Sequence, residues 1–443
     1  MDRRRHVPKV VCNRTSSAEA IEVAEGIADE AVAVVLAGGQ GTRLGGLTLK
    51  RCKPALPFGA HCRSIDFTLS NCLHSGLAHV GVAAQYKADS LVPHLERHWR
   101  QGNPFEGRPV EIWEADARRG GPYAGTADAV YKNLRAIERL KAKFVLVLAA
   151  DHVYRMDYAE LLDFHRRQGA DLTVACHPVV PEEAHHFGIM SVADDEIVAF
   201  HEKPVDVDVG PAPLASMGVY VFDAELLAAL LREDARRPGS RHDFGRDVVP
   251  ACVAAPGVRV AAFPHRDPCA DAGGYWCDIG TIDAYWEASM ALLGADAALD
   301  PGDPRWPILP TLNAAAAGGP GCSDGVARIA GCLAAEDCRI EGATVRRSLL
   351  FGGVRIEPGA VVEDSVLLPG AHVGPDCRVH RAIIDEGVVL GARSRVHGAA
   401  GIEADGCETS AGGVALVCSS LPSVPGRSRD ERARFEATRP LPA

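Results

Sequence analysis

The sequence predicts a two-part protein, in which an α/β domain built on a helix-wound parallel sheet precedes a smaller parallel β-helix. In the first hundred residues, apolar strand-like runs alternate with helix-like stretches, as is typical of a parallel sheet covered by helices. Beyond residue 326, short apolar runs with glycine recur without a helical period. Such repeats are typical of a β-helix, in which each coil buries too little core to be stable alone.

Composition narrows the class of function. The chain has 443 residues, enough for two or three domains, and 47% of them are hydrophobic. Its formal net charge of -11 argues against a nucleic-acid-binding protein, which would present a basic face. The 14 cysteines are scattered without a Cys-x-x-Cys pair, so a zinc site is not expected. We expect a cytoplasmic protein with reduced thiols. No apolar run approaches the ~18 residues that a membrane-spanning helix needs, so no membrane span is expected.

The first element is an apolar run over residues 31–37, predicted as a buried strand. It ends at Gly38, Gly39 and Gly41, where the missing side chains let the backbone bend sharply and approach a bound group. Successive backbone N–H groups in such a turn can hold phosphate oxygens, and Arg43 adds a positive charge. The alternative is a tight turn between strand and helix, which a glycine loop alone leaves about equally open.

The later elements continue the alternation. Helices are expected at 63–73, 90–98, 126–141, 158–169 and 281–293, strands at 80–84, 144–150, 172–176 and 215–222, and a hairpin over 188–200. Gly125 or Thr126 would cap the third helix, whose free N–H groups could face an anion or a base edge. The run 144–150 is the clearest strand and ends at Asp151, where a parallel sheet holds its ligands.

Five segments are expected along the chain. They are an N-terminal extension (1–30), the α/β domain (31–295), a Pro-, Ala- and Gly-rich linker (296–325), the β-helix (326–418) and a disordered tail (419–443). For the repeats of the fourth segment, an ordinary β-sandwich is the alternative.

Several short motifs follow one another in a fixed order. They are Ala37-Gly38-Gly39-Gln40-Gly41-Thr42-Arg43-Leu44, Lys50-Arg51-Cys52-Lys53-Pro54, Ile65-Asp66-Phe67-Thr68-Leu69-Ser70-Asn71-Cys72, Gly125-Thr126-Ala127-Asp128, Asp151-His152-Val153-Tyr154, Glu202-Lys203-Pro204, Ala215-Ser216-Met217-Gly218, His242-Asp243-Phe244-Gly245 and Tyr275-Trp276-Cys277-Asp278-Ile279-Gly280-Thr281. From about Val32 to about Asp385 this set resembles the glucose-1-phosphate adenylyltransferases, also called ADP-glucose pyrophosphorylases. The resemblance implies a nucleotidyltransferase-type, Rossmann-like sheet followed by a left-handed parallel β-helix.

The resemblance also implies a reaction, in which ATP and glucose 1-phosphate give ADP-glucose and pyrophosphate at the entry to glycogen synthesis. The sugar phosphate attacks the α-phosphorus in line, so no side-chain nucleophile is needed and the protein must hold two anions together. Implied with it are Mg²⁺, a homotetramer, and control by sugar-phosphate or carboxylate effectors.

Site residues are carried over on the matching motifs. Asp151 and Asp278 are expected to bind the metal, since Mg²⁺ prefers carboxylate oxygens with phosphates and water. A helix cap or turn role is the alternative for either residue. Asp151, Arg43 and Lys53 form the expected catalytic set, with the two basic side chains facing the β- and γ-phosphates.

The remaining expected roles fall into three groups. Glucose 1-phosphate is expected at Lys203, Glu202, Gly188 and Ser216, the nucleotide at Gly38, Gly39, Gly41, Thr42, Gln85, Tyr123 and Gly125, and effectors at Lys50, Arg51, Arg63, Arg378 and Arg381. For the last two arginines, a solvent-facing position on the β-helix is the alternative. Met217, Phe67 and Leu69 are expected in the core.

Several positions depart from the family pattern. Ala124 and Cys277 replace arginines, and Asp116 falls in a segment that usually carries a glutamine pair near the adenine pocket. We therefore predict an active enzyme with an altered effector response, for example weaker activation by fructose 1,6-bisphosphate. Three alternatives stay open: a related enzyme using UTP, dTTP or GTP, a non-catalytic regulatory subunit, and a β-helix acyltransferase using His372 or His380.

Overall fold

The computed structural model describes residues 26–102, 110–115, 121–205, 210–270, 273–294, 297–310, 314–315, 321–322, 327–398 and 407–418. Most of the expected N-terminal extension and all of the expected tail lie outside these ranges. The chain forms two compact units. The first holds the chain up to Arg43, Lys50–Gly280 and Ala295–Ala314, and the second holds Leu44–Leu49, Thr281–Gly294 and the chain from Ala315 onward.

This division differs from the boundaries expected at residues 295 and 325. Helix α8 (Ile282–Met290), expected to end the α/β domain, belongs to the second unit, where the Trp286 indole donates to the Asp364 carbonyl at 2.8 Å. Residues 297–310, expected as linker, belong to the first unit, where Trp306 is buried and its indole donates to Asn71 at 2.9 Å. One tryptophan in each segment bonds within its unit, and in residues 297–310 the Pro, Ala and Gly content had indicated a linker instead.

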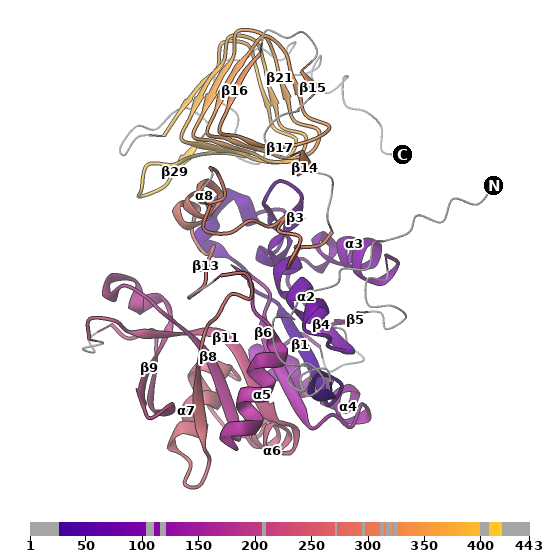
Figure 1. The fold of residues 1–443 in the computed structure, drawn as a ribbon, viewed down its shortest axis with the longest axis vertical. Helices are drawn as coiled ribbons and strands as arrows, with labels where there is room; N and C mark the ends of the chain where they lie inside the picture. Colours follow the sequence, from indigo (N-terminus) through magenta and orange to yellow (C-terminus); the bar gives the residue numbers. More distant parts are fainter. Residues whose placement is uncertain are drawn as a thin grey trace, which may run out of the picture. The chain divides into compact units, whose positions relative to one another are not determined.

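A nine-stranded sheet organises the first unit (Figure 1). In sheet order its strands are β5 (Glu111–Glu114), β4 (His79–Ala84), β1 (Ala31–Ala37), β6 (Phe144–Ala149), β11 (Leu214–Asp223), β8 (Leu172–Pro178), β12 (Val260–Pro264), β10 (Glu196–Glu202) and β9 (Gly188–Ala193). Strands β5, β4, β1 and β6 run parallel, whereas β11 is antiparallel to both β6 and β8. The carboxyl ends of the parallel strands therefore meet at one edge, where wound sheets hold ligands.

Helices pack on both faces of this sheet. They are α2 (Ser64–His74), α4 (Thr126–Arg139), α5 (Tyr158–Gln168), α6 (Ala224–Asp234) and α7 (Val249–Ala254). Because strand side chains alternate, Ala33 and Val35 of β1 enter the core shared with α2 and α5, while Val32 and Val34 enter the core shared with α4, α6 and α7. This two-sided burial explains why β1 is apolar at every position.

One predicted element differs in detail, and another is confirmed. The helix expected over 90–98 is irregular, since α3 covers only Val92–His94 and π-helical turns follow over Leu95–Arg100. The expected hairpin is present as β9 and β10, and both Asp194 and Asp195 at its turn have positive φ, as a tight hairpin turn requires.

A short antiparallel ribbon carries residues of the site. It pairs β7 (His152–Tyr154) with β13 (Trp276–Asp278), and its register sets His152 directly opposite Asp278. Residues directly opposite each other in a ladder project to the same face. The ribbon therefore brings together two motifs that lie more than a hundred positions apart in the sequence.

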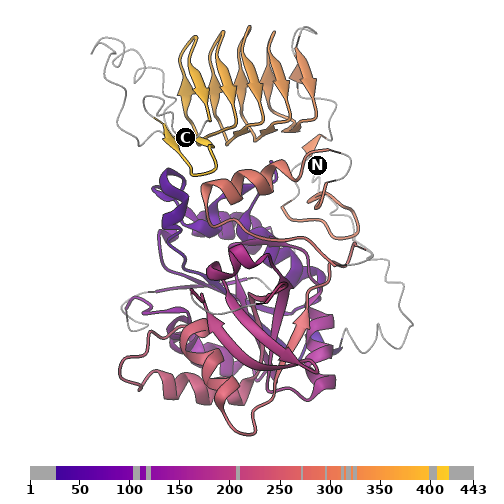
Figure 2. The same ribbon diagram turned by 90° about the vertical axis from the view of Figure 1, so that its left-hand side faces the viewer.

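The second unit contains a parallel β-helix, which confirms the prediction from the repeats (Figure 2). Its three parallel sheets are β17 (Leu333–Ala335), β20 (Leu349–Leu350), β23 (Val366–Leu367), β26 (Ala382–Ile384) and β30 (Ala415–Val417); β18 (Arg339–Ile340), β21 (Arg355–Ile356), β24 (His372–Val373) and β27 (Val389–Leu390); and β16 (Arg328–Ala330), β19 (Thr344–Arg346), β22 (Val361–Glu363), β25 (Arg378–His380) and β28 (Arg395–His397). Ile340, Ile356, Val373 and Leu390 stack in register within its apolar interior. The left-handed sense stays a prediction.

The first unit also contains a two-stranded ribbon of β2 (Pro57–Phe58) and β3 (Cys62–Arg63). In the sheets of the β-helix, β14 (Ala314–Ala315) neighbours β17, β15 (Gly321–Cys322) pairs with β18, and β29 (Glu408–Thr409) pairs with β30. Among the helices that the structure describes, none has the length and apolar character that crossing a bilayer needs.

Candidate active site

A cavity of about 610 Å³ opens in the first unit at the carboxyl ends of β1, β4 and β6. It is lined by every residue that the sequence assigned to catalysis, metal, nucleotide or sugar phosphate: Gly38, Gly39, Gly41, Thr42, Arg43, Lys53, Gln85, Tyr123, Gly125, Asp151, Gly188, Glu202, Lys203, Ser216 and Asp278. The structure thus brings these residues together, while their individual roles stay predictions.

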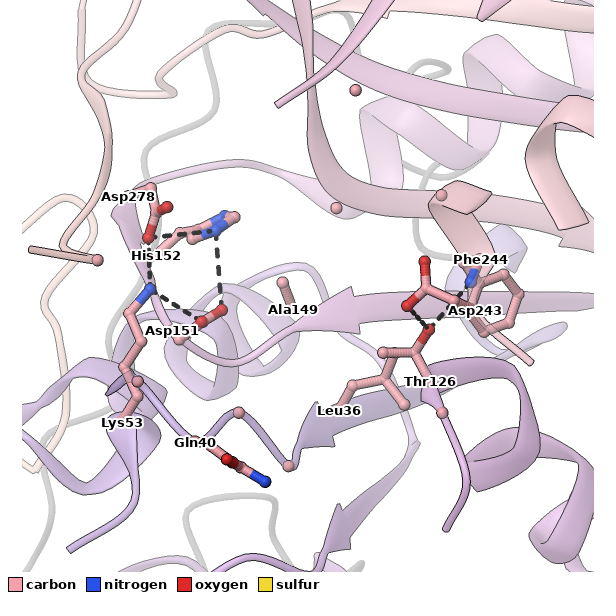
Figure 3. Close-up of a pocket in the computed structure, with 18 of the residues that line it drawn as sticks. Leu36, Gln40, Lys53, Thr126, Ala149, Asp151, His152, Asp243, Phe244 and Asp278 are labelled. Carbon is pink, nitrogen blue, oxygen red and sulfur yellow. Dashed lines mark hydrogen bonds and ion pairs between the residues drawn. The ribbon is translucent and has the colours of Figure 1, made fainter. Parts of the chain in front are cut away.

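One end of the cavity is charged, and Lys53 lies at its centre (Figure 3). The Lys53 ammonium pairs with Asp151 Oδ2 at 2.9 Å and, at closer range, with Asp278 Oδ1. The Lys53 side chain is only 6% exposed, and it opens a short 3-10 helix, Lys53–Ala55, whose residues are all buried. The sequence assigned this lysine to phosphates, and the structure places its amine on the two carboxylates.

The three charges set one another's protonation. Burial opposes the charge on Lys53, but the two carboxylates outweigh it and raise the pKa of the amine. Burial likewise opposes ionisation of Asp151, yet Lys53 and then His152 lower the pKa of that carboxyl to about 2. Asp278 is affected in the same way, with Lys53 holding its pKa below the usual range. Both carboxylates are therefore ionised at neutral pH.

His152 completes this end of the cavity and was not assigned a role from the sequence. Its Nε2 atom lies 3.7 Å from Asp151 Oδ1 and 3.8 Å from Asp278 Oδ1 (Figure 3). One ligand atom from each of the three residues lies within 4.8 Å of the others, so within the described ranges this is the cluster able to hold a metal ion. The register of the β7–β13 ribbon, which only the structure gives, is the signal that could have found it.

Arg43 approaches the same end from the glycine loop. Its Nη2 atom lies 3.7 Å from Asp278 Oδ2, and Nη1 lies 3.3 Å from His186 Nδ1. About half of the Arg43 side chain is exposed, at 48%, so the guanidinium faces the open cavity. Gly280 is needed nearby, because a Cβ there would come within 3.0 Å of both Asp278 and Arg43.

The opposite end of the cavity is held by hydrogen bonds to the backbone. The Gln85 amide donates to the Tyr123 carbonyl at 3.2 Å and accepts from the Tyr123 N–H, so the backbone donor and the backbone acceptor of Tyr123 are both engaged. The Tyr123 hydroxyl in turn donates to the Trp113 carbonyl at 3.1 Å on strand β5. This fixes the chain that enters helix α4.

The start of helix α4 corrects one expectation. Its N–H groups do not face an open anion site, because the Ala127 N–H donates to the His242 carbonyl at 2.7 Å. Gly125 is the N-cap, and a Cβ there would collide with the carbonyls of Arg241 and His242. The Thr126 hydroxyl joins the same loop, donating to Asp243 at 3.0 Å and accepting from the Phe244 N–H at 3.0 Å (Figure 3).

A third region gathers the residues predicted for the sugar phosphate. The Lys203 ammonium lies 3.3 Å from Glu202 Oε1. Two glycines crowd Glu202, since a Cβ on Gly245 would lie 2.5 Å from Oε2 and one on Gly188 would lie 2.9 Å from it. Gly245 was not assigned from the sequence, although the motif His242-Asp243-Phe244-Gly245 was quoted and contains it.

The departures from the family pattern fit locally. Burial raises the pKa of the Cys277 thiol to about 12, so this side chain stays neutral where the family pattern has an arginine. The Ala124 N–H donates to Asp128 at 2.8 Å, which holds the turn before α4 without a side chain. Asp116 lies outside the described residues.

The predicted effector residues belong to two different units. Arg51 is 7% exposed, and the Arg63 guanidinium donates to the Ser90 carbonyl at 2.8 Å. In the second unit, Arg378 donates to the Gly359 carbonyl at 2.8 Å, and Arg381 lies 4.1 Å over the ring of Trp286. Lys50 is exposed. That these side chains meet in one effector site stays a prediction.

Comparisons with known proteins show the family of the chain. The family model of the nucleotidyl transferases matches residues 32–294, and that of the GlmU-like C-terminal hexapeptide matches residues 323–417. Two relatives from Alkalilimnicola ehrlichii are each 44% identical. They are glucose-1-phosphate adenylyltransferase 2, over 338 residues (74% of this chain and 78% of the relative), and glucose-1-phosphate adenylyltransferase 1, over 343 residues (74% and 80%). The chain therefore belongs to the nucleotidyl transferase family and, within it, to the glucose-1-phosphate adenylyltransferases.

Proposed function

We propose that this chain transfers the adenylyl group of ATP to α-D-glucose 1-phosphate, giving ADP-glucose and pyrophosphate, the first committed step of glycogen synthesis. The observation that carries the proposal is the charged end of the cavity. There Asp151 and Asp278 both pair with the Lys53 ammonium, beside Arg43 and the glycine loop. Two ionised carboxylates next to a glycine-rich loop suit a reaction between two anions.

The donor set fits a divalent cation. Both carboxylates are ionised and already accept a cationic group, the Lys53 ammonium, which occupies the space between them. We propose Mg²⁺ as the natural ion, held by Asp151 and Asp278, because it prefers a few carboxylate oxygens with phosphates and water. When bound, the ion would supply charge neutralisation for the phosphates.

The side chains have separate tasks in this proposal. Arg43 and the N–H groups of Gly39 and Gly41 bind the β- and γ-phosphates and neutralise the departing pyrophosphate. Lys203 binds the sugar phosphate and Glu202 accepts glucose hydroxyls. Lys53 shares its positive charge between the carboxylates and the phosphates, since its buried amine stays protonated. No side chain acts as nucleophile, because the attacking phosphate is already ionised.

The end of the cavity opposite Lys53, which is lined by Gln85, Tyr123 and Gly125 and is called the neutral end below, is proposed to bind the nucleoside. Gly38 and Thr42 would complete the turn toward the phosphates. The fixed peptide of Tyr123 gives this end a rigid wall, so base selection rests on positions that cannot easily move.

We further propose cytoplasmic action as a homotetramer, with sugar-phosphate or carboxylate effectors bound by Lys50, Arg51, Arg63, Arg378 and Arg381. The neutral Cys277 supports an altered effector or substrate response, because a fixed positive charge of the family pattern is missing there. A kinetic screen tests this, and strong ordinary activation by fructose 1,6-bisphosphate would contradict it.

The proposal is tested by incubating the purified chain and glucose 1-phosphate with ATP, UTP, dTTP or GTP and measuring pyrophosphate. We expect release with ATP to exceed release with each other nucleotide by at least about tenfold. Preference for another nucleotide would identify a related pyrophosphorylase. No release with any nucleotide or effector would favour a non-catalytic regulatory role.

A further inference from the structure

We infer that His152 is a third ligand of the divalent ion at Asp151 and Asp278, and that its imidazole lets the site accept first-row transition ions such as Mn²⁺ and Co²⁺ as well as Mg²⁺. The inference rests on the proposed function, which places a metal at these carboxylates. It adds a nitrogen donor to an all-oxygen site and changes which metals the site prefers.

The first support is the backbone register. His152 lies directly opposite Asp278 in the β7–β13 ribbon, and Asp151 immediately precedes β7. The Trp276 ring contacts the imidazole edge-on, with ring centroids 5.3 Å apart and planes at 89°. Both the strand pairing and the tryptophan therefore hold the imidazole toward the carboxylates rather than leaving it to rotate.

The second support is the partner of the other ring nitrogen. His152 Nδ1 lies 3.0 Å from the Met217 carbonyl, which can only accept, so Nδ1 carries the proton in the neutral ring. The lone pair is then on Nε2, the atom that faces the carboxylates. Histidines that bind metals typically donate their other N–H to a backbone carbonyl in this way.

The sheet is distorted at the point where that carbonyl is presented. The pairing of β11 with β8 shifts register between Ser216 and Tyr220, which takes Met217 out of the regular ladder. Gly218 has a φ of 66°, and a Cβ there would lie 3.1 Å from Ala149 Cβ and 3.8 Å from His152 Cε1. Bulges near active sites commonly serve to re-aim a group, and here the group is the carbonyl that orients His152.

The third support is the spacing of the ligand atoms. His152 Nε2 lies 3.7 Å from Asp151 Oδ1 and 3.8 Å from Asp278 Oδ1, and one ligand atom of each residue lies within 4.8 Å of the others. An ion could therefore contact all three residues. Ligands at ~2.1 Å from an ion are roughly 3 to 4 Å apart, so the observed spacing needs little adjustment. An imidazole suits Mn²⁺ and Co²⁺ better than it suits Mg²⁺.

The test is pulsed electron paramagnetic resonance of Mn²⁺ added alone to the full chain, without nucleotide. We expect modulation from an imidazole nitrogen in the native protein and its loss in His152→Ala. Calorimetry should show Mn²⁺ affinity falling about 10- to 100-fold in that variant, with Mg²⁺ affinity falling less. His186→Gln is the matched control, since His186 lines the same cavity beside Arg43, and it should keep the nitrogen signal.

The outcomes separate this inference from the proposed function. Bound Mn²⁺ without nitrogen modulation in the native protein overturns the inference and leaves the two-carboxylate metal site standing. A nitrogen signal that disappears in His186→Gln but persists in His152→Ala also overturns it. Failure of Mn²⁺ to bind at all overturns the inference together with the metal site of the proposed function. Because the decisive spectrum is that of the native chain, misfolding of a variant cannot obscure the answer.

Discussion

The two ends of the cavity are built by different means. At the charged end, side chains hold one another, with Lys53 between Asp151 and Asp278. At the neutral end, side chains hold the backbone, as Gln85 does with the peptide of Tyr123. The difference suggests a division of work: charges that can exchange partners serve the reaction, and a fixed backbone serves recognition.

Replacing Lys53, the cation that Asp151 and Asp278 share, should have a larger effect than any change at the neutral end. Lys53→Met removes the ammonium that pairs with both of the partly buried carboxylates and leaves Arg43, 3.7 Å from Asp278, as a more exposed positive charge. We expect pyrophosphate release, measured as kcat/KM, to fall about 100- to 1,000-fold, and the free energy of unfolding to fall by about 3 kcal/mol without metal.

Divalent metal provides the control for that variant. Because the metal would occupy the place of the lost amine, Mn²⁺ should raise the Tm of Lys53→Met by several degrees more than that of the native protein. An equal Tm shift in both proteins would show that Lys53 does not share its position with the ion.

A change at the neutral end should affect nucleotide binding more than turnover. A methyl group on Gly125 would collide with the carbonyls of Arg241 and His242, so Gly125→Ala must displace the start of α4. We expect the KM for ATP to rise about tenfold and the free energy of unfolding to fall by about 1–3 kcal/mol. Gly26→Ala is the control, since a Cβ there meets open space. A change in kcat alone would contradict the division of work.

Gln85→Ala should have a smaller effect at the same end. It removes both hydrogen bonds to the Tyr123 peptide but leaves the Tyr123 hydroxyl on Trp113. We expect the KM for ATP to rise about three- to tenfold with kcat within about twofold, as suits a loss of 0.5–1.5 kcal/mol. Steady-state kinetics at saturating glucose 1-phosphate measures both constants.

The smallest expected effect is on the stability of the fold at acid pH, and it comes from His177. Burial and the neighbouring His265 lower the pKa of His177 to about 4, below its usual value of 6.5. The unfolded chain therefore takes up a proton first as the pH falls, so stability is unaffected above pH 6.5 and is lost between about 6.5 and 4.

Since His177 is partly exposed, we expect that loss to be about 1–2 kcal/mol. Urea unfolding of His177→Asn should show a flatter pH dependence over the same interval. A pH dependence identical to that of the native chain would remove His177 as its source.

The comparison also explains what could be predicted from sequence. Asp151 was predicted as a site residue because it follows the clearest apolar strand. The segment from Gly38 to Arg43 was predicted because its glycines and arginine follow a second apolar strand, β1. These signals are local. The residues that crowd Gly125 and bond to Thr126 come from the loop around Asp243, more than a hundred positions away.

His152 shows the same limit at the charged end. Its sequence neighbour Asp151 was assigned, but its own role depends on strand register, on the Met217 carbonyl and on Trp276. None of these contacts has a periodic or compositional signature. The compact units differ from the expected domains for a related reason, since Trp286 of α8 bonds to Asp364 and Trp306 of residues 297–310 bonds to Asn71, both far away in the sequence.

The central claim, that Asp151 helps to hold a divalent ion between two anionic substrates, is tested most directly by Asp151→Asn. The substitution keeps the size of the side chain and removes its charge. With far-UV circular dichroism unchanged, we predict that kcat for pyrophosphate release at saturating ATP, glucose 1-phosphate and Mg²⁺ falls at least about 1,000-fold. Turnover within about twofold of the native rate would contradict the account.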